Sequence, residues 1–131
     1  LVYDSRTDAF GPCFTAFPGG NLTSTPTGSR FARGYEVFDI AEGSIRAFIV
    51  APNSVPNHTT GLAADGLHLY AGLTDGLAKL RVSDGEYVER IPLPEPIDGQ
   101  ILFAGPRRLI ALAAPNAYLQ GPSRVYVLDV P

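Results

Sequence analysis

The sequence predicts an all-β fold, and three observations support that prediction. Proline (12) and glycine (14) are spread along all of the 131 residues. Both disfavour helix interiors, proline by removing a backbone hydrogen bond and glycine through its conformational entropy. No window of about 11 residues has the apolar spacing of an amphipathic helix. Several short stretches instead alternate apolar and polar residues, which is the period of a β-strand.

The central stretch Gly61–Leu93 predicts a small antiparallel meander. Two Asp-Gly pairs, Asp65-Gly66 and Asp84-Gly85, mark turns there. Asp-Gly suits the positive φ angles that tight hairpin turns require. Before the second pair, residues 78–83 alternate between apolar and polar side chains, as expected of a half-buried strand.

Further strands are expected on both sides of this meander. Residues 35–40 and 124–130 alternate in the same way as the central stretch. The runs Ile101–Ala104 and Leu109–Ala114 are apolar without interruption. Such runs are typical of strands that are covered on both faces.

A repeat organises these strands. Residues 38–43 and 80–85 share the order apolar, polar, apolar, small, acidic, glycine, and they start 42 residues apart (80 minus 38). The pattern starts again at Leu128-Asp129-Val130. A period of about 40 to 50 residues with four short strands is typical of propeller blades. The chain is therefore expected to be one all-β unit of about three propeller-like blades of antiparallel strands, with repeats at 1–34, 35–76 and 77–131.

Three blades do not close a ring, since propellers need at least about four. The uncovered faces and edges that remain favour aggregation. We therefore expect another chain, or a second copy of this one, to complete the ring. The alternative is a small β-sandwich or barrel of about 8 to 10 strands, which fits the length without a partner.

The residues Gly61–Gly66, followed by Leu69-Tyr70-Ala71, resemble blades of the β-propeller superfamily, especially those of the YVTN, NHL and SMP-30/gluconolactonase kind. The resemblance covers Asn57–Pro94 well, and 35–52 and 99–130 more loosely. It implies a propeller fold. For the SMP-30-like enzymes it also implies a divalent cation, held by an asparagine just before this strand and by acids from other blades.

Two residues match that implied metal site. Asn57 lies in a comparable place and Asp65 follows it, and oxygen ligands of this kind suit Ca²⁺. Three residues separate Asn57 from Gly61, however, and no companion acid is evident on the other blades. The alternative is that Asn57 and His58 cap a turn while Asp65 shapes its own hairpin. His58 and Tyr70 are the candidates for a ligand-binding rim.

The composition disfavours some partners and indicates a compartment. The net charge of −3 gives no electrostatic footprint for nucleic acid, and no apolar run is long enough to span a membrane. Asn21-Leu22-Thr23 and Asn57-His58-Thr59 match the N-glycosylation signal, which favours a secreted or extracytoplasmic protein. The chain has no methionine, so a processed or excised segment is expected.

The pattern favours a binding or scaffold module that presents the loops 18–30, 51–60 and 115–123 to a partner. The alternative is a metal-dependent enzyme of the lactonase or hydrolase kind, with Ca²⁺ near Asn57 and Asp65. The sequence identifies no catalytic residue. Cys13 is the only cysteine, and no nucleophile elbow or zinc-protease motif is present.

Overall fold

The computed structural model describes residues 3–4, 6–10, 22–41, 44–49, 59–113 and 124–131. Every regular element in these ranges is a β-strand, which confirms the all-β prediction. A short N-terminal hairpin pairs β1 (Tyr3–Asp4) with β2 (Ala9–Phe10). No helix that could span a membrane occurs in the described part of the chain.

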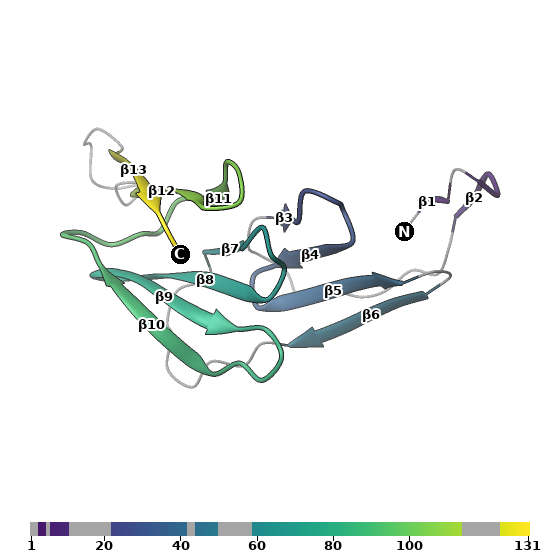
Figure 1. The fold of residues 1–131 in the computed structure, drawn as a ribbon, viewed down its shortest axis with the longest axis horizontal. Helices are drawn as coiled ribbons and strands as arrows, with labels where there is room; N and C mark the ends of the chain where they lie inside the picture. Colours follow the sequence, from purple (N-terminus) through teal and green to yellow (C-terminus); the bar gives the residue numbers. More distant parts are fainter. Residues whose placement is uncertain (1–2, 5, 11–21, 42–43, 50–58, 114–123) are drawn as a thin grey trace.

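Three antiparallel sheets follow the hairpin (Figure 1). The first sheet contains β3 (Leu22–Ser24), β4 (Arg30–Arg33), β5 (Glu36–Ala41) and β6 (Ser44–Ile49). The middle sheet contains β7 (Thr60–Leu62), β8 (His68–Leu73), β9 (Gly76–Arg81) and β10 (Tyr87–Pro92). The third sheet contains β11 (Ile101–Phe103), β12 (Arg108–Ala113) and β13 (Arg124–Asp129).

Each of the three sheets is a meander in which every strand pairs with its neighbour in sequence. The expected Asp-Gly turns are present, and Gly66 (φ 71°) and Gly85 (φ 72°) both adopt the left-handed conformation. Asp65-Gly66 connects β7 to β8, and Asp84-Gly85 connects β9 to β10. The predicted central meander is therefore confirmed.

The sequence repeat corresponds to the third strand of each sheet. Phe38 lies in β5, Leu80 in β9 and Leu128 in β13. Each pairs with an apolar residue of the second strand, in the pairs Phe38–Phe31, Leu80–Leu69 and Leu128–Leu109. The sheets span 22–49, 60–92 and 101–129, so their bounds differ from the repeats 1–34, 35–76 and 77–131. The repeat pattern identifies a strand inside each sheet and not its first residue.

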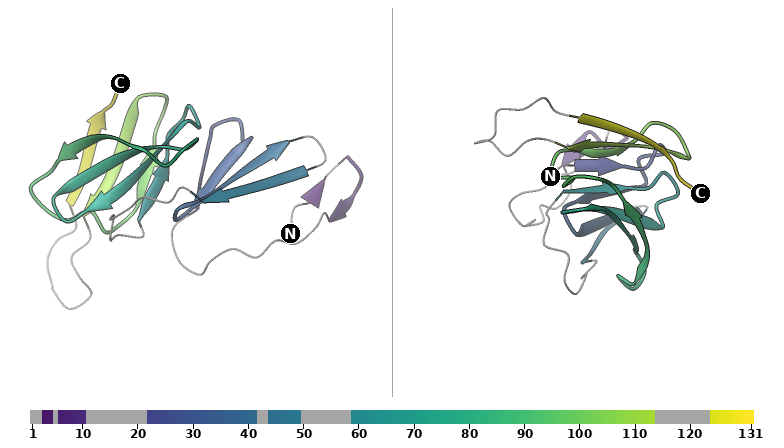
Figure 2. Two further views of the ribbon diagram at one scale, coloured as in Figure 1. Left: turned by 90° about the horizontal axis from the view of Figure 1, so that it is seen from below. Right: turned by 90° about the vertical axis from the view of Figure 1, so that its left-hand side faces the viewer.

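The sheets pack face to face, with the first strands β3, β7 and β11 next to one another (Figure 2). The middle sheet is covered on both faces. One buried cluster, which includes Leu69 and Leu80, lies between it and the first sheet. The other, which includes Tyr70 and Leu77, lies between it and the third sheet. Neighbouring residues along a strand therefore contribute to different clusters, because strand side chains alternate between faces.

The third sheet differs from the prediction of strands covered on both faces. In β12, Leu109 and Ala111 are buried, but Ile110 and Leu112 are only half-buried. The middle sheet covers one face, and no described segment covers the other to the same extent. The strand therefore has the composition of a doubly covered strand and the burial of a singly covered one.

Candidate functional site

The first strands of the sheets are joined by threonine side chains. The backbone N–H of Leu62 donates to Oγ1 of Thr23 at 2.9 Å, which links the middle sheet to the first. The hydroxyl of Thr60 donates to the carbonyl of Gly34 at 2.6 Å across the same interface. Both threonines are at most 9% exposed. These bonds satisfy polar groups where the sheets meet, since an unpaired buried polar group would be costly.

The middle and third sheets approach each other more closely than side chains would allow. A Cβ atom added to Gly61 would lie 2.6 Å from Cγ2 and from the carbonyl oxygen of Ile101. Gly61 therefore acts through the absence of a side chain, which lets β7 and β11 come into contact. The hydroxyl of Thr59 donates to the carbonyl of Asp98 at 2.9 Å near this interface.

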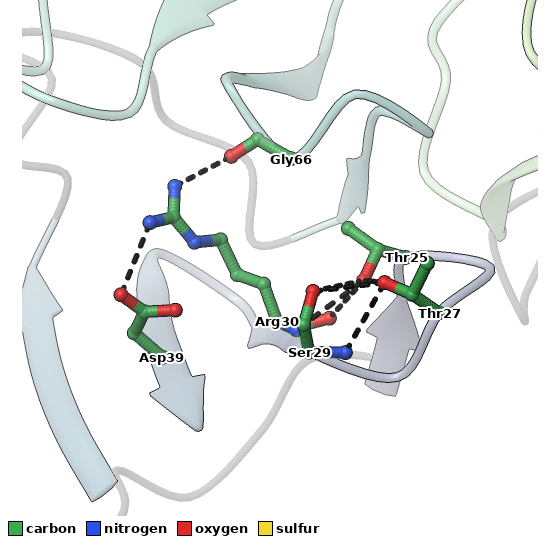
Figure 3. A network of polar contacts seen from close by, with 6 residues as sticks. All are labelled: Thr25, Thr27, Ser29, Arg30, Asp39 and Gly66. Atoms are coloured by element: carbon green, nitrogen blue, oxygen red, sulfur yellow. Dashed lines mark hydrogen bonds and ion pairs between the residues drawn. The ribbon is translucent and has the colours of Figure 1, made fainter. Parts of the chain in front are cut away.

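Figure 3 shows a polar network where the first and middle sheets meet. The guanidinium of Arg30 donates through Nη1 to the carbonyl of Gly66 at 2.8 Å and through Nη2 to Oδ2 of Asp39 at 3.2 Å. Thr25, Thr27 and Ser29 form hydroxyl contacts within the β3–β4 turn. Arg30 thus holds a carboxylate of its own sheet and a turn of the next sheet at once.

The corresponding turn of the middle sheet contains Asp65 and His68. One carboxylate oxygen of Asp65 accepts the backbone N–H of Leu67 at 2.8 Å, and the other lies 3.0 Å from Nδ1 of His68. Partial burial raises the pKa of Asp65, but the hydrogen bonds from Leu67 and His68 outweigh it and hold the pKa below its ordinary value of 3.8. Asp65 therefore stabilises its own turn as a carboxylate.

The predicted site residues fall into two groups. Asn21, Asn57 and His58 lie outside the described residues, so the Ca²⁺ site and the glycosylation sites stay predictions. Asp65 and Tyr70 are described, Asp65 in the turn between β7 and β8 and Tyr70 within β8. The described residues contain no group of three or more His, Cys, Asp or Glu side chains that could hold a metal.

Tyr70 lies in the core and not on the surface. It is 1% exposed and contacts Phe103, with ring centroids 5.4 Å apart. The ammonium of Lys79 lies 5.9 Å from the centre of its ring. Burial, followed by the charges of Glu89 and Asp65, raises the pKa of Tyr70 to about 12. Tyr70 is therefore a packing residue between the middle and third sheets.

The outer face of the third sheet is an apolar surface that we call the open face. It is formed by Leu102, Ile110, Leu112, Val125 and Val127, which the strand register places on one side. Val125 is 61% and Val127 is 59% exposed. Large exposed side chains in a continuous sheet face indicate an interaction surface.

The outer face of the first sheet is also apolar. Phe31 and Phe38 stack on it, with centroids 4.8 Å apart. Phe38 is buried, but Leu22 is 66% and Ile40 is 37% exposed. Both lie on the side opposite Val37, which packs against the middle sheet. The two ends of the sheet stack thus carry four of the seven large exposed hydrophobic residues in the described part of the chain.

Solved structures of other proteins resemble this chain. A hydrazine synthase from Kuenenia stuttgartiensis matches 88% of this chain and 34% of its own, with 16% identity and a TM-score of 0.54. A gluconolactonase from Xanthomonas campestris matches 87% and 38%, with 20% identity and a TM-score of 0.55. Both are propeller-type proteins. The fold is a partial β-propeller. The three meanders are its blades, as the sequence resemblance implies.

The partial propeller spans little more than a third of the length of these solved structures. At these identities the likeness concerns the fold alone. No protein-family model and no curated protein sequence matches the chain.

Sequence reasoning missed the residues that join the blades. Arg30 and Thr23 were expected only as residues of the loop 18–30, and Thr59 and Thr60 only as residues of the loop 51–60. The first expectation is wrong in part, because β3 (Leu22–Ser24) lies inside 18–30 and β4 begins at Arg30. A signal was nevertheless present, because Arg30 is the first residue of the second strand of its blade, just as Arg108 is in the third blade. Aligning the blades by their second strands would have identified both arginines.

Proposed function

We propose that the chain is a binding or scaffold module whose ring of blades is completed by another chain or by a second copy. The open face is the observation that carries this proposal. Blades bury both faces of their sheets against neighbours, as the middle blade does here. A blade whose outer face is apolar and more than half exposed at Val125 and Val127 has the surface that a further blade would cover.

The test is a comparison of two valine variants by sedimentation velocity over a range of concentrations. Val127 lies on the open face, and Val88 lies on β10 and is 43% exposed. We expect the wild-type chain to have a mass above the 13.9 kDa of one chain. Val127→Glu should return it to one chain, and Val88→Glu should not. A folded wild-type chain that stays at 13.9 kDa at every concentration would overturn completion of the ring by a second copy. If no partner chain then copurifies with the protein from its natural source, the proposal falls as a whole.

A metal-dependent enzyme of the lactonase or hydrolase kind is the second candidate. The likeness to a gluconolactonase supports it, together with the position of Asn57 before the first strand of the middle blade. Stoichiometric Ca²⁺ retained through dialysis and lost in Asn57→Ala would favour the enzyme, as would hydrolysis of a sugar lactone. Retention of no metal by the wild-type chain would exclude this metal site.

We also propose that the protein is secreted and glycosylated at Asn21 and Asn57. Both asparagines stand in acceptor motifs. Intact-mass measurement before and after glycosidase treatment of the protein from its natural source tests this. A mass that glycosidase leaves unchanged would remove the support for secretion. A glycan on Asn57 would also count against the Ca²⁺ site, because it would occupy the same side chain.

A further inference from the structure

The interface between the first and middle blades provides a template for what covers the open face. Arg30, the first residue of β4, lies opposite Asp39 of β5 on the face that is turned toward the middle blade. Its guanidinium bonds to Asp39 and to the carbonyl of Gly66 in the β7–β8 turn. With the middle blade in place, the Arg30 and Asp39 side chains are 23% and 38% exposed.

We call the arginine–aspartate pair of this template its donor half, and the turn whose carbonyl accepts from the arginine its acceptor half. The third blade repeats the donor half on its open face. Arg108, the first residue of β12, lies opposite Asp129 of β13, and Nε of Arg108 lies 3.5 Å from Oδ1 of Asp129. The register places this pair on the same face as Ile110 and Val127. The two side chains are 60% and 75% exposed, because no described blade covers them.

The acceptor half of the template is a four-residue turn with a left-handed glycine. In the middle blade, the N–H of Gly66 bonds to the carbonyl of Ala63, and the N–H of Ala63 to that of His68, both at 2.9 Å. In the first blade, the N–H of Gly28 donates to the carbonyl of Thr25, and the N–H of Thr25 donates to the carbonyl of Arg30, again both at 2.9 Å. The φ angles of Gly28 and Gly66 are 69° and 71°. The two turns are therefore equivalent.

The interface between the middle and third blades lacks both halves. His68 and Arg81 occupy the donor positions there, and Arg81 pairs with Asp84 and Glu86. The β11–β12 turn is one residue shorter, since the N–H of Ala104 bonds to the carbonyl of Arg108. The arginine-to-glycine contact is therefore a feature of particular blade pairs and not of every pair.

Two turns in the described part of the chain match the acceptor half, one at Gly66 and one at Gly28. The turn at Gly66 is already occupied, because the first blade covers that face of the middle blade and Arg30 bonds to the carbonyl of Gly66. The turn at Gly28 belongs to the first blade, whose outer face is exposed at Leu22, Ser24 and Ile40. We infer that the first blade of a second copy docks on the open face, with Arg108 donating to the carbonyl of Gly28 of that copy. This inference rests on the proposed function and names the partner.

The contact joins two different surfaces of the same chain, so it is a heterologous interface. Two such contacts related by a two-fold axis join two sets of three blades into one closed ring. The bond from Arg108 fixes the register of the two blades, and the apolar faces supply the buried area.

Cross-linking tests this geometry directly. Ala104 occupies the place of Thr25, whose Cγ2 atom lies 3.1 Å from the position of a Cβ on Gly66. In a Cys13→Ser background, Ala104→Cys and Ser29→Cys are prepared as separate proteins, mixed, and treated with a short bismaleimide. We expect a cross-linked dimer only in the mixture. Ala104→Cys that links to itself, or a mixture without a linked dimer, would overturn the inference.

Two arginine variants give a second measurement. We expect Arg108→Ala to weaken the association of the copies by about tenfold or more, because it removes a charged donor from the interface. Arg124→Ala is the matched control, since Arg124 is 66% exposed, lies in the same blade and pairs with Glu95 instead. Equal effects of the two variants would overturn the inference. Association above 13.9 kDa without the mixed cross-link would overturn it and leave the proposed function standing.

Discussion

The guanidinium of Arg30 spans two blades, because it donates to the carbonyl of Gly66 in the middle blade while it is paired with Asp39 in its own. The distance to Gly66 is 2.8 Å, and the Arg30 side chain is only 23% exposed. A charged donor in such a place contributes more than an exposed one, since water competes less for its partners.

Arg30→Ala should therefore destabilise the chain. We expect the free energy of unfolding to fall by about 1 to 2 kcal/mol, because two charge-assisted hydrogen bonds are lost at a half-buried position. Urea denaturation measures the change. Arg90→Ala is the matched control, since Arg90 pairs with Asp75 but is 48% exposed, and its loss should cost about 0.5 kcal/mol or less. Equal losses would show that the bond to Gly66 contributes little.

The substitution Gly61→Ala should destabilise the fold more than the addition of a single methyl group usually does. The new methyl group would lie 2.6 Å from the side chain and from the carbonyl oxygen of Ile101, so the middle and third blades must move apart. We expect a loss of about 2 kcal/mol or more in the free energy of unfolding. Gly28→Ala is the comparison, because Gly28 has open space around it and only its φ of 69° opposes a side chain. That strain costs about 1 kcal/mol. A Gly61→Ala protein as stable as the wild type would contradict the contact.

The chain should lose stability at alkaline pH through Tyr70. Its pKa is raised from 10.0 to about 12 by burial, so the folded state keeps the phenol proton that the unfolded state releases. This contribution is complete below pH 10 and is lost as the pH rises from 10 through about 12. Tyr70→Phe should flatten this part of the stability profile, measured by urea denaturation between these pH values. Tyr87→Phe on the exposed strand β10 serves as the control, and an unchanged profile in Tyr70→Phe would contradict the assignment.

Acid should act on the turn of the middle blade. The pKa of Asp65 is lowered below 3.8, so its contribution to stability is present above that value and is lost as the pH falls through the lower, folded-state pKa. Because the side chain is 49% exposed, we expect Asp65→Asn to cost about 1 kcal/mol or less at neutral pH. The difference between the variant and the wild type should vanish in strong acid. A difference that persists unchanged there would assign the effect to packing.

The sequence was sufficient to predict the central meander and the recurrence of the blades, because both follow from local patterns. Strand β3 and the start of β4 were missed, since 18–30 has the composition of a loop. The Asp-Gly turns and the repeat at Phe38 and Leu80 lie within single sheets, where neighbours in sequence are neighbours in space. The joints between blades could not be predicted in this way. Arg30 and Gly66 are separated by 36 residues, and their contact depends on how two finished sheets pack.

Tyr70 is a second residue whose environment could not be predicted, because it depends on how the sheets pack. Alternation along β8 places the side chain of Tyr70 on one face of the sheet and those of Leu69 and Ala71 on the other. Alternation alone does not tell whether the face that carries Tyr70 meets solvent or another sheet. The middle blade is covered on both faces, so a tyrosine predicted at a rim lies in the core.

The uninterrupted course of each meander has a consequence for biogenesis. The stretches 22–49, 60–92 and 101–129 each contain all the strands of one sheet, so no pairing has to wait for a distant part of the polypeptide. Short-range pairings of this kind form quickly. Each sheet can therefore assemble as soon as its own stretch has left the ribosome, and the sheet at 101–129 then finds the middle sheet, against which it packs, already formed.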